Sequence, residues 1–148
     1  MRRPTSPGSI VRGIIFRQVR REFGVEDSIL LVSAVRAGLP MRELAELREA
    51  LDLPMERVAA KIGMSRATFH RRRKTGVLSP DESDKAIRLA RILGHAISVF
   101  GNHEAARQWL SAPQAALGGE IPLDLAETEI GAREVEQLIG RIDYGVYP

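Results

Sequence analysis

The sequence predicts an all-α protein, and three observations support this prediction. Apolar residues recur at helical spacing along most of the chain, no segment alternates apolar and polar residues as a half-buried strand does, and serine, proline and glycine stand where helices would begin and end. The 148 residues are 44% hydrophobic and 28% charged, enough for one domain with a real core or for two very small ones. We expect a helical bundle with an N-terminal helix-turn-helix region and a small helical module at its C-terminal end.

Residues 10–78 are expected to form an N-terminal helical region that follows a short arm. The arm, residues 1–9, contains two prolines, one glycine and almost nothing to bury, so we expect it to be flexible and basic. Apolar spacing predicts a first helix between residues 14 and 23 and a second helix over 29–36. A third amphipathic helix is predicted over 41–53.

The second half of the chain carries the clearest helix signals. The sequence Ser-Pro-Asp-Glu at 79–82 offers a capping serine, proline at the first helical position and a glutamate that can close a capping box. The helix that it starts can run to Phe100, and its broad apolar surface predicts a central place in the core. Further helices are predicted over 103–110 and between residues 128 and 145. A boundary between two units is expected at residue 79.

The formal net charge of +3 conceals an uneven distribution. Residues 1–100 contain 19 Lys and Arg against 11 Asp and Glu, whereas residues 119–148 contain seven acidic residues against two arginines. This polarity suggests a polyanionic partner for the basic segment, residues 1–100, and a basic partner for the acidic segment, residues 119–148. Solvated surface charge without any partner is the alternative, and charge alone does not decide between them.

Composition and motifs argue against several classes of function. The chain has no cysteine, hence no disulfide or thiolate metal site, and its apolar runs are far shorter than the roughly 20 residues of a membrane span. No signal-like apolar stretch follows the N-terminal arginines, so we expect a cytoplasmic protein. His70, His95 and His103 lack metal-binding spacing, and no glycine-rich phosphate loop is present. We therefore expect a protein that is no enzyme and needs no metal or cofactor.

A helix-turn-helix motif is predicted over residues 55–75, where two short helices at 55–62 and 65–74 are joined through Gly63. The second helix carries hydroxyl groups and a dense cationic cluster, which suit the base edges and phosphates of DNA. The candidate DNA-binding residues are Ser65, Arg66, Thr68, His70, Arg71, Arg72 and Arg73. A helical hairpin with a solvated arginine face is the alternative interpretation.

The motif sequence Val-Ala-Ala-Lys-Ile-Gly-Met-Ser-Arg-Ala-Thr-Phe-His-Arg-Arg-Arg at 58–73 resembles the helix-turn-helix of phage-repressor-like, Xre-type regulators. In such regulators the second helix lies in the major groove, and dimers bind two-fold sites. The resemblance therefore implies operator DNA as a partner and a homodimer. The chain departs from the pattern at Arg72, which stands where these regulators usually have an apolar residue.

The second half also carries an ordered set of short motifs. They are a Trp-Leu pair at 109–110, a Leu-Gly-Gly turn at 117–119, a Pro-Leu-Asp-Leu step at 122–125 and a Thr-Glu-Ile-Gly cap at 128–131. In this order they resemble the toxin-binding domain of the MbcA/ParS/Xre antitoxin family, and the resemblance extends over residues 79–148. It implies a toxin as partner, which for the Xre branch is usually a RES-domain enzyme that consumes NAD.

The end of the chain is the candidate toxin-binding segment. Two tyrosines and an apolar pair occupy its last residues, whereas termini are usually frayed and polar, and tyrosine is enriched in binding hot spots. The candidate toxin-binding residues are Arg141, Asp143, Tyr144, Gly145, Val146, Tyr147 and Pro148. With the resemblance, the acidic character of the segment suggests that it occludes a positively charged dinucleotide site. A tail that folds back on its own domain is the alternative.

The sequence thus predicts the antitoxin of a type II toxin–antitoxin system. Such a protein would neutralise a RES-type toxin through its C-terminal region and regulate its own operon through the helix-turn-helix. The alternative is a stand-alone transcriptional regulator whose C-terminal module dimerises or senses a ligand.

Overall fold

The computed structural model describes residues 13–24 and 27–145, so the predicted arm, residues 1–9, lies outside the described part of the chain. The helices are α2 (Ile14–Val19), α3 (Ser28–Ala37), α4 (Met41–Leu51), α5 (Met55–Lys61), α6 (Arg66–Thr75), α7 (Pro80–Phe100), α8 (His103–Ser111), the 3-10 helix η2 (Ala115–Leu117), α9 (Pro122–Leu125) and α10 (Glu129–Asp143). The described segments contain no strand, only isolated bridges between Pro40 and Val77 and between Gln114 and Glu120. The all-α prediction is confirmed.

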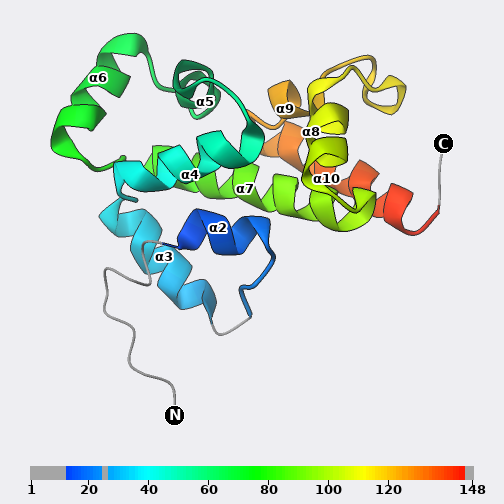
Figure 1. Ribbon diagram of the computed structural model, residues 1–148, viewed down its shortest axis with the longest axis horizontal. Helices are drawn as coiled ribbons and strands as arrows, with labels where there is room; N and C mark the ends of the chain where they lie inside the picture. The colour runs from blue at the N-terminus through cyan, green and yellow to red at the C-terminus, as the bar shows by residue number, and fades with distance from the viewer. Residues whose placement is uncertain (1–12, 25–26, 146–148) are drawn as a thin grey trace.

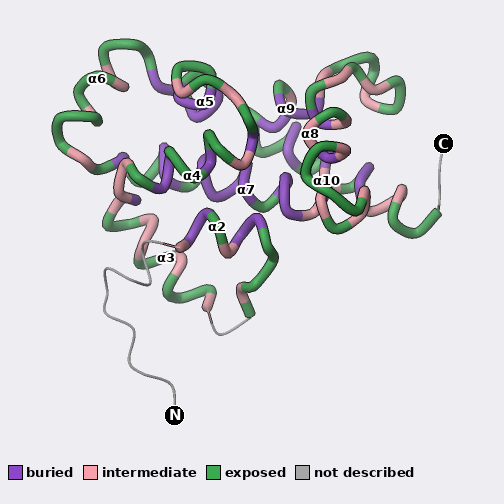
Figure 2. The backbone as a smooth tube through the Cα atoms, viewed as in Figure 1, coloured by how far each residue is buried: buried purple, intermediate pink, exposed green. Residues whose placement is uncertain are grey.

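The long helix α7 forms the axis of the fold (Figure 1). It begins with the predicted capping box: Ser79 Oγ accepts the Glu82 amide at 3.1 Å, and the Glu82 carboxylate accepts the Ser79 amide at 2.8 Å. Leu89, Ile92 and Leu93 on this helix are almost completely buried. Figure 2 shows buried stretches along α7. Its broad apolar surface therefore holds the centre of the core, as the sequence predicted.

Helices from both halves of the chain pack against α7. The N-terminal half contributes α2, α3 and α4, and the C-terminal half contributes α8 and α10, so one continuous core serves both halves. The end of α2 approaches closely at Gly94, where a Cβ would lie 2.6 Å from the Gln18 carbonyl oxygen and 2.7 Å from that of Val19. Only glycine permits this approach. Ser79, where the boundary was expected, is the N-cap of α7, and the boundary itself stays a prediction.

Two predicted helices end earlier than the apolar pattern indicated. α2 stops before Phe23, because Arg21 has a φ of 55°, in the left-handed region. α4 likewise stops two residues before Leu53, because Asp52 has a φ of 53°. Phe23 and Leu53 nevertheless pack against the core. The apolar spacing therefore identified two core residues correctly but overestimated the length of both helices.

The link between α8 and α9 contains the 3-10 helix η2, which was not predicted. Gly118 and Gly119 follow it with φ values of 69° and 84°, so the Leu-Gly-Gly motif is a tight turn. None of the helices in the described segments is long and apolar enough to cross a membrane.

Candidate functional site

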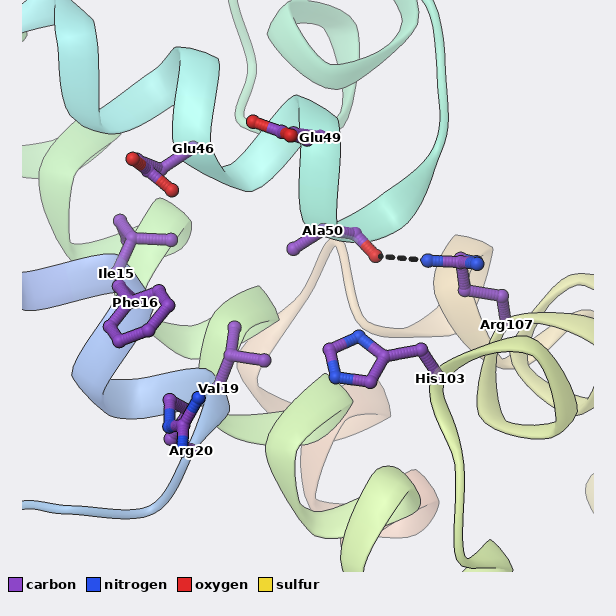
Figure 3. A pocket seen from close by; sticks show the side chains of 9 residues that line it. All are labelled: Ile15, Phe16, Val19, Arg20, Glu46, Glu49, Ala50, His103 and Arg107. Carbon is purple, nitrogen blue, oxygen red and sulfur yellow. Dashed lines mark hydrogen bonds between the residues drawn. The ribbon is translucent and has the colours of Figure 1, made fainter.

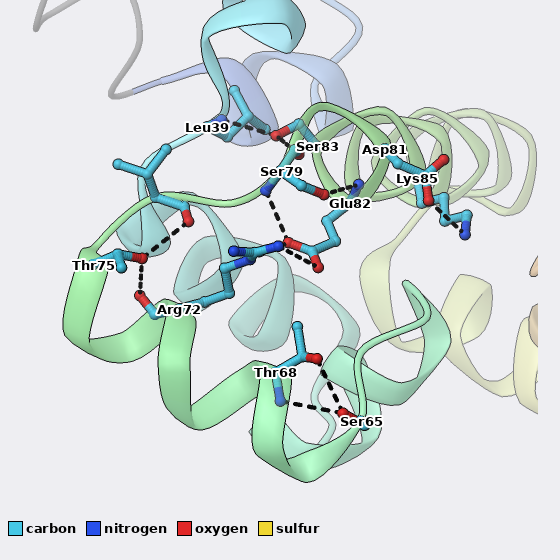
Figure 4. Close-up of polar contacts among 11 residues, drawn as sticks. Leu39, Ser65, Thr68, Arg72, Thr75, Ser79, Asp81, Glu82, Ser83 and Lys85 are labelled. Atoms are coloured by element: carbon cyan, nitrogen blue, oxygen red, sulfur yellow. Dashed lines mark hydrogen bonds and ion pairs between the residues drawn. The ribbon is translucent and has the colours of Figure 1, made fainter.

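Helices α5 and α6 form the predicted helix-turn-helix. Gly63 makes the turn with a φ of 83°, and the Met64 amide donates to the Ala59 carbonyl at 2.9 Å, which closes the end of α5. Ser65 then caps α6, since its Oγ accepts the Thr68 amide at 3.2 Å (Figure 4). The roles predicted for Gly63 in the turn and for Ser65 as the cap are confirmed.

Helix α6 exposes most of its cations to solvent, and none of its residues is buried. Of the candidate DNA-binding residues, those that are exposed are Ser65, Arg66, His70, Arg71 and Arg73, and those that are half-buried are Thr68 and Arg72. The Arg73 guanidinium lies over the Phe69 ring, 5.8 Å from its centroid. Within residues 13–24 and 27–145, no carboxylate forms an ion pair with Arg66 or Arg71. Their charges remain available to a phosphate or a base edge.

Arg72 differs from the other cations of α6. Its Nε donates to Glu82 Oε1 at 2.8 Å and its Nη2 to Glu82 Oε2 at 3.5 Å, which ties α6 to the first turn of α7 (Figure 4). Burial raises the pKa of Glu82, but hydrogen bonds from Arg72 and from the Ser79 amide outweigh burial and leave this pKa below its usual value. The ion pair engages Nε and Nη2 of Arg72, so this residue helps to position α6 against α7. A DNA contact by Arg72 stays a prediction.

In the C-terminal module, α9 leads almost directly into α10. Thr128 caps α10, because its Oγ1 accepts the Gly131 amide at 3.0 Å. Gly131 lies so close to α9 that a Cβ on it would sit 1.9 Å from the Leu125 carbonyl oxygen. The last motif of the ordered set, Thr-Glu-Ile-Gly, thus combines a helix cap with a position that only glycine can occupy.

A buried arginine on α7 holds the junction between α9 and α10. Arg88 donates from Nε to the Ala126 carbonyl at 3.2 Å, from Nη2 to the Glu127 carbonyl at 3.0 Å and from Nη1 to the Glu129 carboxylate at 3.3 Å. The rigid fork of a guanidinium can satisfy three such acceptors at once. Sequence reasoning missed this role. An available signal was that Arg88 interrupts a stretch of otherwise apolar residues, 86–90.

A buried lysine connects the helix-turn-helix to the C-terminal module. Lys61, at the end of α5, is only 7% exposed, and its Nζ lies 3.0 Å from Asp124 Oδ1 and 3.8 Å from Glu127 Oε1. Asp124 belongs to α9 and Glu127 to the turn after it. Sequence reasoning also missed this pair, because Asp124 lies 63 residues beyond Lys61 and no local pattern joins them.

The end of α10 presents the candidate toxin-binding residues far from α6 (Figure 1). Tyr144 is 86% exposed, Asp143 is exposed as well, and Arg141 is half-buried. Gly145 has a φ of 75° and follows the helix end, as predicted. The remaining candidates, residues 146–148, lie outside the described part of the chain.

A hollow of about 460 Å³ opens between α2, α4 and α8 (Figure 3). Ile15, Phe16 and Val19 make its apolar side, and Arg107 spans from α8 to α4 by donating to the Ala50 carbonyl at 3.2 Å. Its lining includes no serine, threonine or cysteine, so it offers no hydroxyl or thiol nucleophile. No three His, Asp or Glu side chains of the described residues gather to hold a metal ion.

Comparison with known families assigns both halves of the chain. Residues 30–91 match the family described as the antitoxin Xre-like helix-turn-helix domain. Residues 95–145 match the family described as the antitoxin Xre/MbcA/ParS C-terminal toxin-binding domain. The two matches adjoin within α7, the helix against which both halves pack.

Curated relatives agree with these matches. The Antitoxin Xre of Yersinia enterocolitica is 33% identical over 135 residues, which cover 88% of this chain and 91% of the relative. The Antitoxin Xre of Photorhabdus laumondii is 39% identical over 72 residues, 48% of this chain and 49% of the relative. A Prs ADP-ribosylating antitoxin of Sphingobium is 23% identical over 126 residues, 78% of this chain and 79% of the relative.

The fold and its two sites define a two-module binding protein, in which a helix-turn-helix domain and a toxin-binding domain share one long helix. The chain belongs to the Xre antitoxin family.

Proposed function

We propose that this protein is the antitoxin of a type II toxin–antitoxin pair in the cytoplasm. It binds and neutralises a RES-type, NAD-degrading toxin through the end of α10, and it regulates its own operon by binding operator DNA through α6. It acts by binding and not by catalysis. The observation that carries the proposal is the separation of two exposed sites, the cationic helix α6 and the tyrosine-bearing end of α10, towards opposite ends of the molecule (Figure 1).

The end of α10 has the character of a docking segment. Tyr144 is almost fully exposed, and an aromatic ring that the core does not use is a common anchor of protein interfaces. Seven acidic residues lie within 119–148. Asp124, Glu127, Glu129 and Glu136 form ion pairs within the chain, whereas Asp143 is exposed beside Tyr144 and favours a positively charged partner surface. A toxin that consumes NAD needs such a surface to hold the pyrophosphate of its substrate. The name of the Sphingobium relative refers to ADP-ribosylation, which supports a toxin of related chemistry.

Helix α6 has the character of a recognition helix. Arg66 stands in its first turn, and the N-terminal residues of a recognition helix are those that reach base edges, where arginine binds guanine bidentately. Arg71 and Arg73 follow on the exposed surface and suit phosphates. Such helices usually act in pairs on two-fold operators, so we propose a homodimer as the DNA-binding form.

Co-expression with the toxin tests the proposal in the cell. The toxin would be the product of the neighbouring reading frame, expressed with the full-length protein, with a truncation that lacks residues 144–148, or with the double variant Arg66→Ala/Arg71→Ala. We expect growth rescue by the full-length protein and by the double variant, and failure by the truncation with native helix content in circular dichroism. A truncation that rescues growth as well as the intact protein would show that the toxin is held elsewhere.

The same experiment addresses the alternative of a stand-alone regulator. If the full-length protein binds its promoter but neither rescues growth nor co-purifies with the neighbouring gene product from the native host, the alternative is favoured.

A further inference from the structure

A second hollow, of about 320 Å³, lies at the end of α2, against α7 and α10. Its lining is mostly polar and comes from both halves of the chain. The residues that line it are Gln18, Arg21, Phe23, Arg91, His95 and Glu136. Its volume is at the lower end of the range for small-molecule sites. The hollow is therefore large enough for a small ligand, and it includes none of the candidate DNA-binding or toxin-binding residues.

The charged groups of this hollow are mainly cationic. The guanidiniums of Arg21 and Arg91 line it together with one carboxylate, that of Glu136. Among the described residues, the Arg91 guanidinium donates from Nε to Glu136 at 2.8 Å, and the Arg21 guanidinium donates from Nη1 to Ser98 Oγ at 3.0 Å. A guanidinium carries more N–H donors than these bonds use. The hollow therefore combines net positive charge with donors that remain available.

Gln18 supplies the observation that points to a ligand. This glutamine of α2 is 9% exposed, yet its side-chain amide forms no hydrogen bond with any residue of 13–24 or 27–145. Buried amides normally have a partner. The amide atoms of Gln18 are not fully sealed from solvent, because the residue lines the hollow. A ligand in the hollow can therefore supply the partner that the protein does not.

His95 adds a group whose protonation responds to an anion. Burial, followed by the charge of Arg21, lowers the pKa of His95, whereas the carboxylates of Glu136 and Asp143 on α10 act in the opposite direction. Arg91 lines the hollow one turn earlier on α7. The imidazole is therefore mostly neutral near neutral pH. A bound anion favours its protonated form and raises this pKa.

We propose that this hollow binds the phosphate group of a small molecule, with Gln18, Arg21 and Arg91 as its principal donors. Guanidiniums recognise phosphate through charge-assisted hydrogen bonds. Donors that come from two separate segments suit a tetrahedral oxyanion, which accepts in several directions, better than a planar carboxylate. The bound group would tie the end of α2 to α7. The proposal does not depend on the identity of the toxin or of the operator.

This hollow is separate from the proposed DNA surface. Arg72 ties α6 to the first turn of α7 through Glu82. Arg91 and His95 lie about 14 Å and 20 Å further along α7, at 1.5 Å per residue. The expected ligand is therefore a small molecule and not the operator.

Nuclear magnetic resonance titration of the full-length protein tests the site. In a phosphate-free buffer at constant ionic strength, inorganic phosphate should shift the amide resonances of Gln18, Arg21 and His95 in a saturable way. We expect a Kd on the order of 1 mM, as suits a ligand of few atoms. The pKa of His95, followed through its imidazole C–H resonances, should rise when the site is saturated.

A parallel titration with adenosine monophosphate distinguishes the two sources of a phosphate group. Tighter binding of adenosine monophosphate supports the site and identifies a nucleotide-type ligand. Equal or weaker binding, with saturable binding of inorganic phosphate, supports the site and identifies the free ion.

Arg21→Gln should weaken phosphate binding at least tenfold, about 1.4 kcal/mol, because it removes a charged donor. The matched control is Arg20→Gln, since Arg20 is the neighbouring exposed arginine, pairs with Glu22 and does not line this hollow. The control should bind phosphate as the wild type does. Glu136→Gln should strengthen binding, because it removes the carboxylate from the lining. Circular dichroism checks that each variant is folded.

Gln18→Met gives a second readout that leaves the charges unchanged. Methionine keeps the approximate volume of the side chain and removes the amide, so the variant should fold at least as stably as the wild type and bind phosphate several-fold more weakly. Loss of stability with unchanged phosphate affinity would show that the amide has a structural role and would contradict its role as a donor.

Three results would overturn the proposal. One is the absence of a saturable shift with phosphate or adenosine monophosphate at concentrations far above the expected Kd, which would mean that the hollow holds water alone. Another is an equal loss of affinity in Arg20→Gln and Arg21→Gln, which would indicate diffuse attraction to a basic surface. The third is acetate that binds as tightly as phosphate, which would refute the preference for a tetrahedral oxyanion.

Discussion

Glu43 shows how strongly the fold constrains a single residue. This glutamate of α4 is fully buried, and its Oε2 accepts the Ile15 amide at 3.1 Å in the first turn of α2. Its Oε1 has no hydrogen-bond partner among the described residues. Burial raises the pKa of Glu43 to about 7, although hydrogen bonds from the amides of Ile15 and Ile14 act in the opposite direction. The Glu43 carboxyl, which accepts an amide in the first turn of α2, is therefore about half protonated near neutral pH.

This pKa predicts a pH-dependent stability. Below pH 4.5 Glu43 is protonated in both the folded and the unfolded chain, and it does not contribute to the pH dependence. Between pH 4.5 and about 7 unfolding releases its proton, so the free energy of unfolding falls as the pH rises, by roughly 3 kcal/mol in all, and then levels off.

Glu43→Gln tests this dependence, because it keeps the acceptor for the Ile15 amide and cannot ionise. We expect the variant to match the wild type near pH 4.5 and to be more stable at pH 8, on the order of 2 kcal/mol after allowance for its buried amide. Urea unfolding at the two pH values measures the difference. Equal stability of the two proteins at pH 8 would refute the assignment.

At the scale of elements, helix starts marked by a capping side chain were the most predictable features. The caps at Ser65, Ser79 and Thr128 follow from local sequence and are present in the structure. The left-handed conformations of Arg21 and Asp52 were not predictable, because neither residue is a glycine and non-glycine residues rarely adopt a positive φ.

The candidate DNA site likewise has a part that local sequence predicts and a part that only the fold reveals. Local sequence located the exposed cations of α6, but only the fold shows that Arg72 is bound to Glu82. The pairs made by Lys61 and Arg88 join segments far apart in sequence, and no periodicity reveals them.

Gly131 and Gly140 on α10 provide a matched test of the approach between α9 and α10. Gly131→Ala should destabilise the protein by several kcal/mol, about the range of an overpacked core site, because its Cβ would meet the Leu125 carbonyl. Gly140→Ala meets nothing within 4 Å and should be neutral or stabilising by roughly 0.5–1 kcal/mol, since alanine favours a helix. Thermal unfolding should therefore shift in opposite directions. A Gly131→Ala variant as stable as the wild type would mean that α9 does not lie where the structure places it.

The cations of α6 make separable predictions for DNA binding. Arg66→Ala should cost about 1–3 kcal/mol at one base position and relax sequence preference, whereas Arg71→Ala and Arg73→Ala should weaken binding to all DNA and each reduce the salt slope by about 1. Gel shifts with specific and non-specific DNA over a salt series measure both effects. Equal losses on the two DNAs for Arg66→Ala would contradict the groove-reading role.

At the scale of the whole molecule, one core supports two surfaces with different partners. α7 is packed by helices from both halves, and the Lys61 pair and the Arg107 bond cross between them, so the two sites sit on one framework. The sequence asymmetry in charge has its counterpart here, with exposed cations on α6 and the acidic segment in α9 and α10. Composition predicted that polarity, whereas the shared core emerged only from the fold.

The central claim is that toxin binding resides in the end of α10 and is independent of α6. Calorimetric titration of the purified toxin with the full-length protein and with the chain lacking residues 144–148 tests it most directly, with operator affinity as the control. Each interface tyrosine is worth on the order of 2 kcal/mol, about thirtyfold in affinity, so the truncation should weaken toxin binding by at least that factor and leave operator binding unchanged. Equal toxin affinities for the two proteins would contradict the claim.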